Sequence, residues 1–121
     1  MSTVQQVDIV RRTRLKELGQ LRPGDTNAAT IYSPGSNIVA RIVSIFVCET
    51  SGTARTFRIF LDKDGTTYDQ TTALFYDSAV AANSTVQIEG GIFMENPAGN
   101  LAVRSSNASS LTFTVYGEEI T

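Results

Sequence analysis

Short stretches in which apolar and polar residues alternate run through most of this chain. The clearest are residues 56–61, 85–89 and 111–116, in each of which every second side chain is apolar. A period of two residues places those apolar side chains on one face of a strand. Clusters of Gly, Pro, Asn and Ser separate the stretches at intervals of about 8–12 residues, a spacing typical of all-β domains. The sequence therefore predicts an all-β fold: an antiparallel β-sandwich, jelly-roll-like, of about eight short strands.

The longest apolar run, residues 38–48 (IVARIVSIFVC), departs from this alternation. In a regular strand both of its faces would be mostly apolar, whereas only one face of a strand in a two-layer sandwich meets the core. We therefore expect the second face to be covered by the protein's own N-terminal arm, by another subunit or by another protein. The candidate interface residues on that face are Val39, Arg41, Val43, Ile45 and Val47.

Residues 1–22 differ from the remainder in charge. They carry five Lys or Arg and two Asp or Glu, whereas residues 23–121 carry five and ten. Their apolar residues are loosely spaced like one face of a helix, although a short strand fits as well. The sequence predicts an N-terminal arm, extended or a short helix, over residues 1–22 and a β-sandwich domain over residues 23–121. The candidate interface residues of the arm are Val7, Val10, Arg11, Arg12, Arg14, Leu15, Lys16 and Leu18.

The basic arm and the acidic body favour a protein partner. An acidic protein surface fits the arm better than nucleic acid does, because dedicated nucleic-acid-binding domains show a basic face. No apolar run approaches the length of roughly 20 residues that a membrane span needs, so we expect no membrane insertion. The expected partners are therefore other proteins.

Catalytic chemistry is limited by what the composition lacks. The chain has no His and a single cysteine, Cys48, which excludes Ser-His and Cys-His pairs, an internal disulfide and Cys/His zinc sites. Residues 62–73 resemble a calcium loop at their start, but the glycine and the final carboxylate of an EF-hand are not at the required positions. We expect no enzymatic activity, no cofactor and no metal.

Three segments resemble one family. They are residues 18–61, which contain IYSPG and a long Val/Ile strand ending near a Cys before TFRI, residues 73–94, which contain FYD and ANST, and the C-terminal SSLTFTVYGEEIT. Together they resemble small β-rich virion proteins of tailed bacteriophages. The resemblance leaves out residues 1–17 and does not indicate which part of the virion is concerned.

The resemblance implies a non-enzymatic structural protein of the virion, made in the bacterial host cytoplasm. The favoured role is a decoration (cement) subunit that stabilises the assembled capsid through its arm and one apolar sheet face. A neck, tail or fibre adaptor is the alternative, and a carbohydrate- or receptor-binding module is a third. The implied partners are the major capsid protein or neck and tail proteins, together with further copies of the chain, with a trimer as the expected homo-oligomer.

Overall fold

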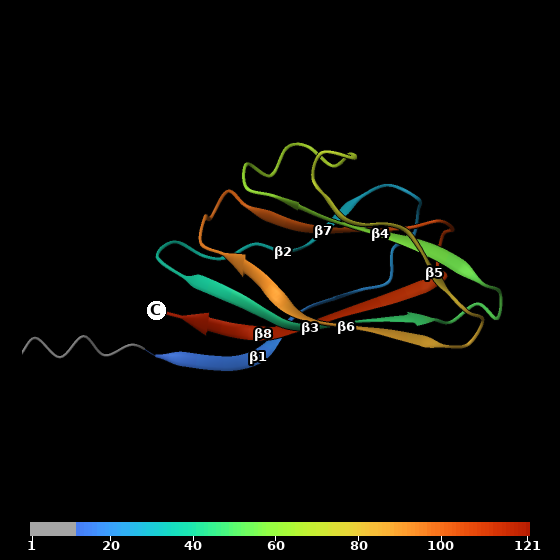
Figure 1. Ribbon diagram of the computed structural model, residues 1–121, viewed down its shortest axis with the longest axis horizontal. Coiled ribbons are helices and arrows are strands. Elements are labelled where there is room, and N and C mark those ends of the chain that lie inside the picture. The colour runs from blue at the N-terminus through green and yellow to red at the C-terminus, as the bar shows by residue number, and fades with distance from the viewer. Residues whose placement is uncertain (1–11) are drawn as a thin grey trace, which may run out of the picture.

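The computed structural model describes residues 12–121, and within that range the chain is all-β, with eight strands and no helix. The strands form two four-stranded antiparallel sheets that lie one above the other (Figure 1). The fold class expected from the alternation is therefore confirmed. The strands are β1 (Thr13–Leu21), β2 (Ala29–Tyr32), β3 (Val39–Glu49), β4 (Arg55–Asp62), β5 (Ala73–Val80), β6 (Thr85–Met94), β7 (Asn100–Ser105) and β8 (Leu111–Ile120).

The strand order is that of a jelly roll. One sheet has the order β1-β8-β3-β6 and the other β2-β7-β4-β5. The hydrogen-bonded pairs β4–β5, β3–β6, β2–β7 and β1–β8 are nested around the β4–β5 connection, as if one long hairpin had been rolled into two layers. This double-sheet arrangement occurs in viral capsid and lectin domains. It leaves the final strand, β8, in the interior of its sheet between β1 and β3.

The core lies between the two sheets. β8 contributes Leu111, Phe113 and Val115, all with no exposed surface, which matches the alternation of residues 111–116. The ring of Phe113 meets that of Phe57 on β4 edge to face, with centroids 6.2 Å apart. This contact joins interior strands of the two sheets, so the C-terminal strand is part of the core.

A β-bulge in β3 explains why both of its faces looked apolar. The register with β6 and β8 shifts between Ile42 and Ser44. The extra residue reverses the alternation, because a bulge places two residues of one strand opposite one of its neighbour. Before the bulge Ala40 and Ile42 point into the core, and after it Ile45 and Val47 do. The outward orientation expected for Ile45 and Val47 is therefore wrong.

Within the arm expected over residues 1–22, residues Thr13–Leu21 form β1, an edge strand that pairs with β8. Of the two conformations left open by the sequence, this part adopts the strand. β1 approaches β2 closely at Gly19, so that a Cβ there would clash with the carbonyl oxygen of Ile31. Val7, Val10 and Arg11 lie outside the described residues, so their assignment to an interface remains a prediction.

Candidate docking surface

The side of the β1-β8-β3-β6 sheet that faces away from the second sheet carries most of the exposed large apolar side chains. We call this side the outer face; in Figure 1 it is the underside of the lower layer. Six large apolar side chains of the described chain are exposed, and four of them lie on this face. These four are Leu15 (72% exposed), Phe93 (66%), Tyr116 (42%) and Val39 (41%). A cluster of this kind is typical of a protein interaction site.

One row of side chains crosses the outer face from edge to edge. Leu15 on β1 is paired with Glu118 on β8, Glu118 with Arg41 on β3, and Arg41 with Phe93 on β6. Directly paired residues of antiparallel strands project from the same face of the sheet. The row therefore reads apolar, acidic, basic, apolar across the four strands.

An ion pair lies at the middle of this row. Arg41 binds Glu118 through two contacts, Nη2 to Oε1 at 2.9 Å and Nε to Oε2 at 3.2 Å. Because the side chains are 46% and 19% exposed, the pair contributes little to stability by itself. Its fork-like geometry nevertheless fixes the direction of both side chains, so the row presents a defined pattern of charge.

Further apolar side chains extend the outer face along the strands. Tyr116 meets the half-buried ring of Phe46 edge to face, with centroids 5.9 Å apart. Towards the other end of the sheet Val39 is paired with Ile120. Val43 is half-buried and lies next to the β3 bulge. Apolar side chains thus lie on β8 and β3 on both sides of the ion pair.

The interface residues expected on the long strand are divided by the bulge. Val39 and Arg41 belong to the outer face, Val43 is half-buried at the bulge, and Ile45 and Val47 belong to the core. Whether the first three contact a partner remains a prediction. The sequence interpretation missed Phe93 and Tyr116, which belong to other strands of the same face.

The basic residues expected to bind a partner are partly bonded within the chain. Lys16 Nζ lies 2.6 Å from Glu119 Oε1, and Glu119 Oε2 accepts a hydrogen bond of 2.7 Å from the hydroxyl of Tyr32. Lys16 and then Tyr32 hold the pKa of Glu119 below its usual value. This network joins β1 and β8 to β2 on the second sheet. Lys16 is therefore a contact within the sandwich, whereas Leu15, its neighbour, projects from the outer face.

The other candidate interface residues of the arm differ in their surroundings. Leu18 packs against the core. Arg12 and Arg14 are exposed at the start of β1, where the backbone carbonyl of Arg12 accepts a hydrogen bond from the amide of Thr121. Of the described arm residues, Leu15 is the one that belongs to the apolar outer face.

A separate polar cluster occupies the far side of the second sheet. Arg58 donates to both carboxylate oxygens of Asp77, at 2.7 and 3.1 Å, and its guanidinium lies 3.9 Å from the ring centroid of Tyr76. Asp77 has a φ of 53°, and the β4–β5 register shifts beside it. This irregularity lets the adjacent residues Tyr76 and Asp77 both contact Arg58. The three contacts attach the edge strand β5 to β4.

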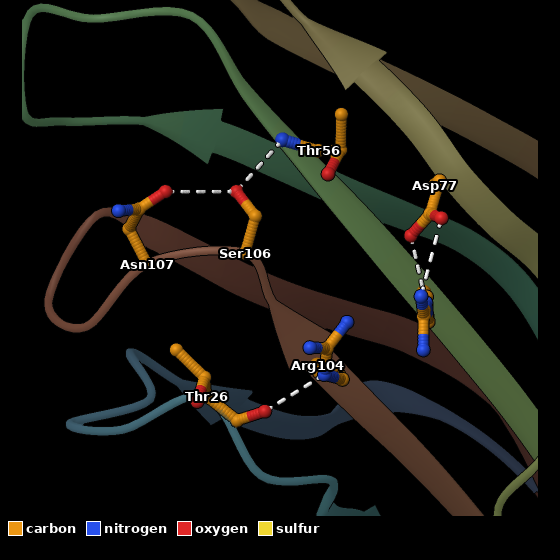
Figure 2. A network of polar contacts seen from close by, with 7 residues as sticks. Thr26, Thr56, Asp77, Arg104, Ser106 and Asn107 are labelled. Carbon is orange, nitrogen blue, oxygen red and sulfur yellow. Dashed lines mark hydrogen bonds and ion pairs between the residues drawn. The ribbon is translucent and has the colours of Figure 1, made fainter.

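Figure 2 shows the neighbourhood of this cluster. Arg104 on β7 is paired with Arg58 on β4, and its Nε donates 2.7 Å to the carbonyl oxygen of Thr26. Ser106 Oγ accepts a hydrogen bond of 3.1 Å from the amide of Thr56. These polar groups fasten the strands and the β1–β2 connection to one another, and their hydrogen-bonding capacity is largely used within the chain.

The acidic loop that begins at Asp62 is organised by its own backbone. The Asp62 carboxylate accepts hydrogen bonds from the amides of Asp64, Thr66 and Thr67, at 3.1, 2.8 and 2.6 Å. These bonds, led by that of Thr67, hold the pKa of Asp62 below its usual value. Residues 12–121 contain no group of three or more His, Cys, Asp or Glu side chains placed to hold a metal together.

A shallow groove of about 520 Å³ lies at one end of the sandwich. Leu61, Met94 and the exposed ring of Phe93 supply its apolar lining, and Lys63 and Glu95 supply charge. The groove adjoins the outer face at Phe93. In the described part of the chain, no helix has the length and hydropathy of a transmembrane span.

Comparisons with known proteins do not place the chain in a family. No family model matches it, and no curated protein sequence is significantly similar. A chain in the structure of infectious bursal disease virus, Gx strain, is similar with a TM-score of 0.43 and 10% sequence identity. The similarity covers 93% of this chain and 32% of the other, so this chain spans about a third of that chain's length. Values this low assign neither a family nor a function.

Proposed function

We propose that this chain is a non-enzymatic structural subunit of a tailed-bacteriophage virion, and that it assembles with other subunits of the virion through the outer face. The preferred role is a decoration subunit on the capsid. A neck, tail or fibre adaptor is the second form of the same proposal. The observation that carries the proposal is the concentration of exposed apolar side chains on one face of one sheet.

The physical argument starts from the free energy of exposing that apolar face to water. Exposed apolar surface is unfavourable in water at about 25 cal/mol per Å². Leu15, Phe93, Tyr116 and Val39 place such surface on one face of a single sheet. Covering them with a partner recovers this free energy, and aromatic residues are enriched where proteins dock. A subunit that works inside an assembly has such a partner present throughout its life.

Two further observations support the proposal without deciding it. The resemblance of residues 18–61, 73–94 and the C-terminal segment to phage virion proteins is the reason for proposing a tailed-phage particle. The jelly-roll fold is frequent among viral capsid domains, although a fold alone does not determine a function.

A carbohydrate-binding module is the competing proposal, because lectin domains share this fold. The tyrosines and aspartates that would serve it are engaged elsewhere. Tyr68 packs against Phe60 and its hydroxyl accepts from Asn100, Asp69 bonds to Thr71, and Tyr76 and Asp77 contact Arg58. Four of the six exposed large apolar side chains of the described chain lie on the outer face, which favours a protein partner.

The test is a copy count in virions purified from the phage, or the induced prophage, that encodes the chain. Quantitative mass spectrometry against the major capsid protein is expected to give a ratio near one or a simple fraction of it. A few to a few dozen copies per particle would replace the decoration role by the neck, tail or fibre role. Absence from the particle would contradict the proposal and place the binding module first.

A further inference from the structure

The row of side chains across the outer face is complementary to itself when it is reversed. From β1 to β6 it reads Leu15, Glu118, Arg41, Phe93. Reversed, it reads apolar, basic, acidic, apolar. Laying the reversed row over the original places apolar against apolar at both ends and opposite charges against each other at the centre.

We infer that the occupant of the outer face is the same face of a second copy of this chain, in a two-fold symmetric dimer. The axis runs along the strands between β8 and β3. In this arrangement Leu15 faces Phe93 of the other copy, and Glu118 faces the other copy's Arg41. The inference names the partner of the docking face on which the proposed function rests.

The neighbouring rows mostly fit the same operation. Ile120 and Val39 are paired within the sheet, so reversal places each against the other in the second copy. Phe46 is paired with Thr114 within the sheet, so reversal places Phe46 over Thr114 of the second copy. These contacts add apolar area on both sides of the central charges.

One pairing opposes the dimer. Glu17 and Glu89 end the row that passes through Tyr116, so reversal places the two carboxylates opposite each other. Both residues are exposed at the edges of the sheet, where solvent and salt screen the repulsion. The effect is a modest loss of affinity, and the central rows decide the arrangement.

The size of the face sets the expected strength. Four strands spaced by about 4.8 Å, with about nine residues each at a rise of about 3.3 Å, give a flat area near 600 Å² per copy. This lies below the roughly 800 Å² per partner of a standard interface. We therefore expect a dimer that dissociates in the micromolar range, in which the ion pairs fix the register and the apolar ends supply most of the affinity.

Introducing opposite charges at the two apolar ends of the row tests the arrangement. Within one chain Leu15 and Phe93 are separated by β8 and β3, about 14 Å at the usual strand spacing, so they do not touch. Only a second copy brings them together. Leu15→Lys and Phe93→Glu should each weaken dimerisation at least about tenfold, because each places a charge against an apolar side chain in both halves of the dimer.

The double variant Leu15→Lys/Phe93→Glu should bind at least about threefold more tightly than either single variant, because each introduced lysine faces the introduced glutamate of the other copy. Both side chains are exposed, so the fold should tolerate the changes; circular dichroism melts check this. Leu74→Lys is the matched control, since Leu74 is 43% exposed but lies on the second sheet. It should leave dimerisation unchanged.

Sedimentation velocity over a concentration series gives the result. A concentration-dependent dimer with the expected losses and recovery supports the inference. A monomer at every concentration overturns it, and so does a trimer, because a face that binds its own copy cannot close a ring of three. A double variant no stronger than the single ones also overturns it. If the chain dimerises but is absent from virions, only the proposed function is contradicted. If the chain is a monomer in solution but is found in virions, only this inference is contradicted.

Discussion

Replacing Gly117 by alanine is expected to lower the free energy of unfolding by about 3 kcal/mol, the upper end of the usual cost of overpacking. Gly117 lies on β8, opposite Ile42 of β3 and Lys16 of β1. An added Cβ would come within 2.4 Å of the carbonyl oxygen of Arg41 and 2.7 Å of Leu18 Cδ1. The first of these atoms belongs to the backbone of the neighbouring strand and cannot rotate away, so β3 and β8 must separate or shift.

Urea unfolding monitored by circular dichroism measures this loss as a lower midpoint at an unchanged slope. Gly24→Ala is the matched control, because a Cβ at Gly24 meets nothing within 4 Å and its backbone needs no positive φ. That variant should unfold at the midpoint of the original chain. If Gly117→Ala shares this midpoint, the close approach of β3 to β8 is not a constraint on the fold.

Gly117 also illustrates what the sequence could and could not predict about the fold. The alternation of residues 111–116 correctly predicted the last strand and its inward side chains. It could not predict that β8 pairs with both β1 and β3, because those partners are far away in the sequence. The eight strands follow from local patterns, whereas the nested order of a jelly roll depends on contacts between residues as distant as Thr13 and Ile120.

The β3 bulge limited the prediction of the candidate site in a similar way. Strict alternation assigned Ile45 and Val47 to the same face as Val39, and a single extra residue near Ser44 reverses that assignment. The sequence signal for such a bulge is weak, since two apolar halves of opposite phase look like one strand with two apolar faces. The apolar content of the run therefore indicated burial correctly but did not show which face of the sheet each side chain occupies.

Two residues of the outer face were within reach of sequence reasoning. Ile92 and Met94 point into the core, so alternation alone places Phe93 between them on the outside. Tyr116 follows in the same way from Val115. What alternation could not supply is that both aromatic rings, together with Leu15, lie on one continuous face, because this depends on the pairing of four strands.

The second large effect is the dependence of stability on pH through Glu49. Glu49, at the end of β3, is 2% exposed, yet its carboxylate is bonded to the two loops around it. It accepts from the amide and hydroxyl of Ser51, both at 2.6 Å, and from the amides of Gly52, Thr53 and Asn83 at 2.7, 3.0 and 3.3 Å. Burial alone would raise its pKa, but these bonds, led by those of Ser51, lower the pKa from 4.5 to about 2.

The direction of the pH dependence follows from this shift. The folded protein binds the Glu49 proton more weakly than the unfolded chain does, so ionised Glu49 stabilises the fold. This contribution is complete above about pH 4.5 and is lost as the pH falls from there through about 2. We therefore expect the melting temperature of the original chain to fall across that window in part because Glu49 becomes protonated.

Glu49→Gln should lower the melting temperature at neutral pH by roughly 5–10 °C, because the amide nitrogen of glutamine cannot accept the hydrogen bonds that one carboxylate oxygen now receives. The difference from the original chain should shrink as the pH falls below about 4.5 and the native carboxylate is protonated. Glu95→Gln is the control: Glu95 is exposed, and no hydrogen bond or ion pair to its side chain is present within residues 12–121. Melting curves of the three proteins between pH 7 and pH 2 decide the matter, and a constant difference across this range would show that Glu49 supports the loops by its shape and not by its charge.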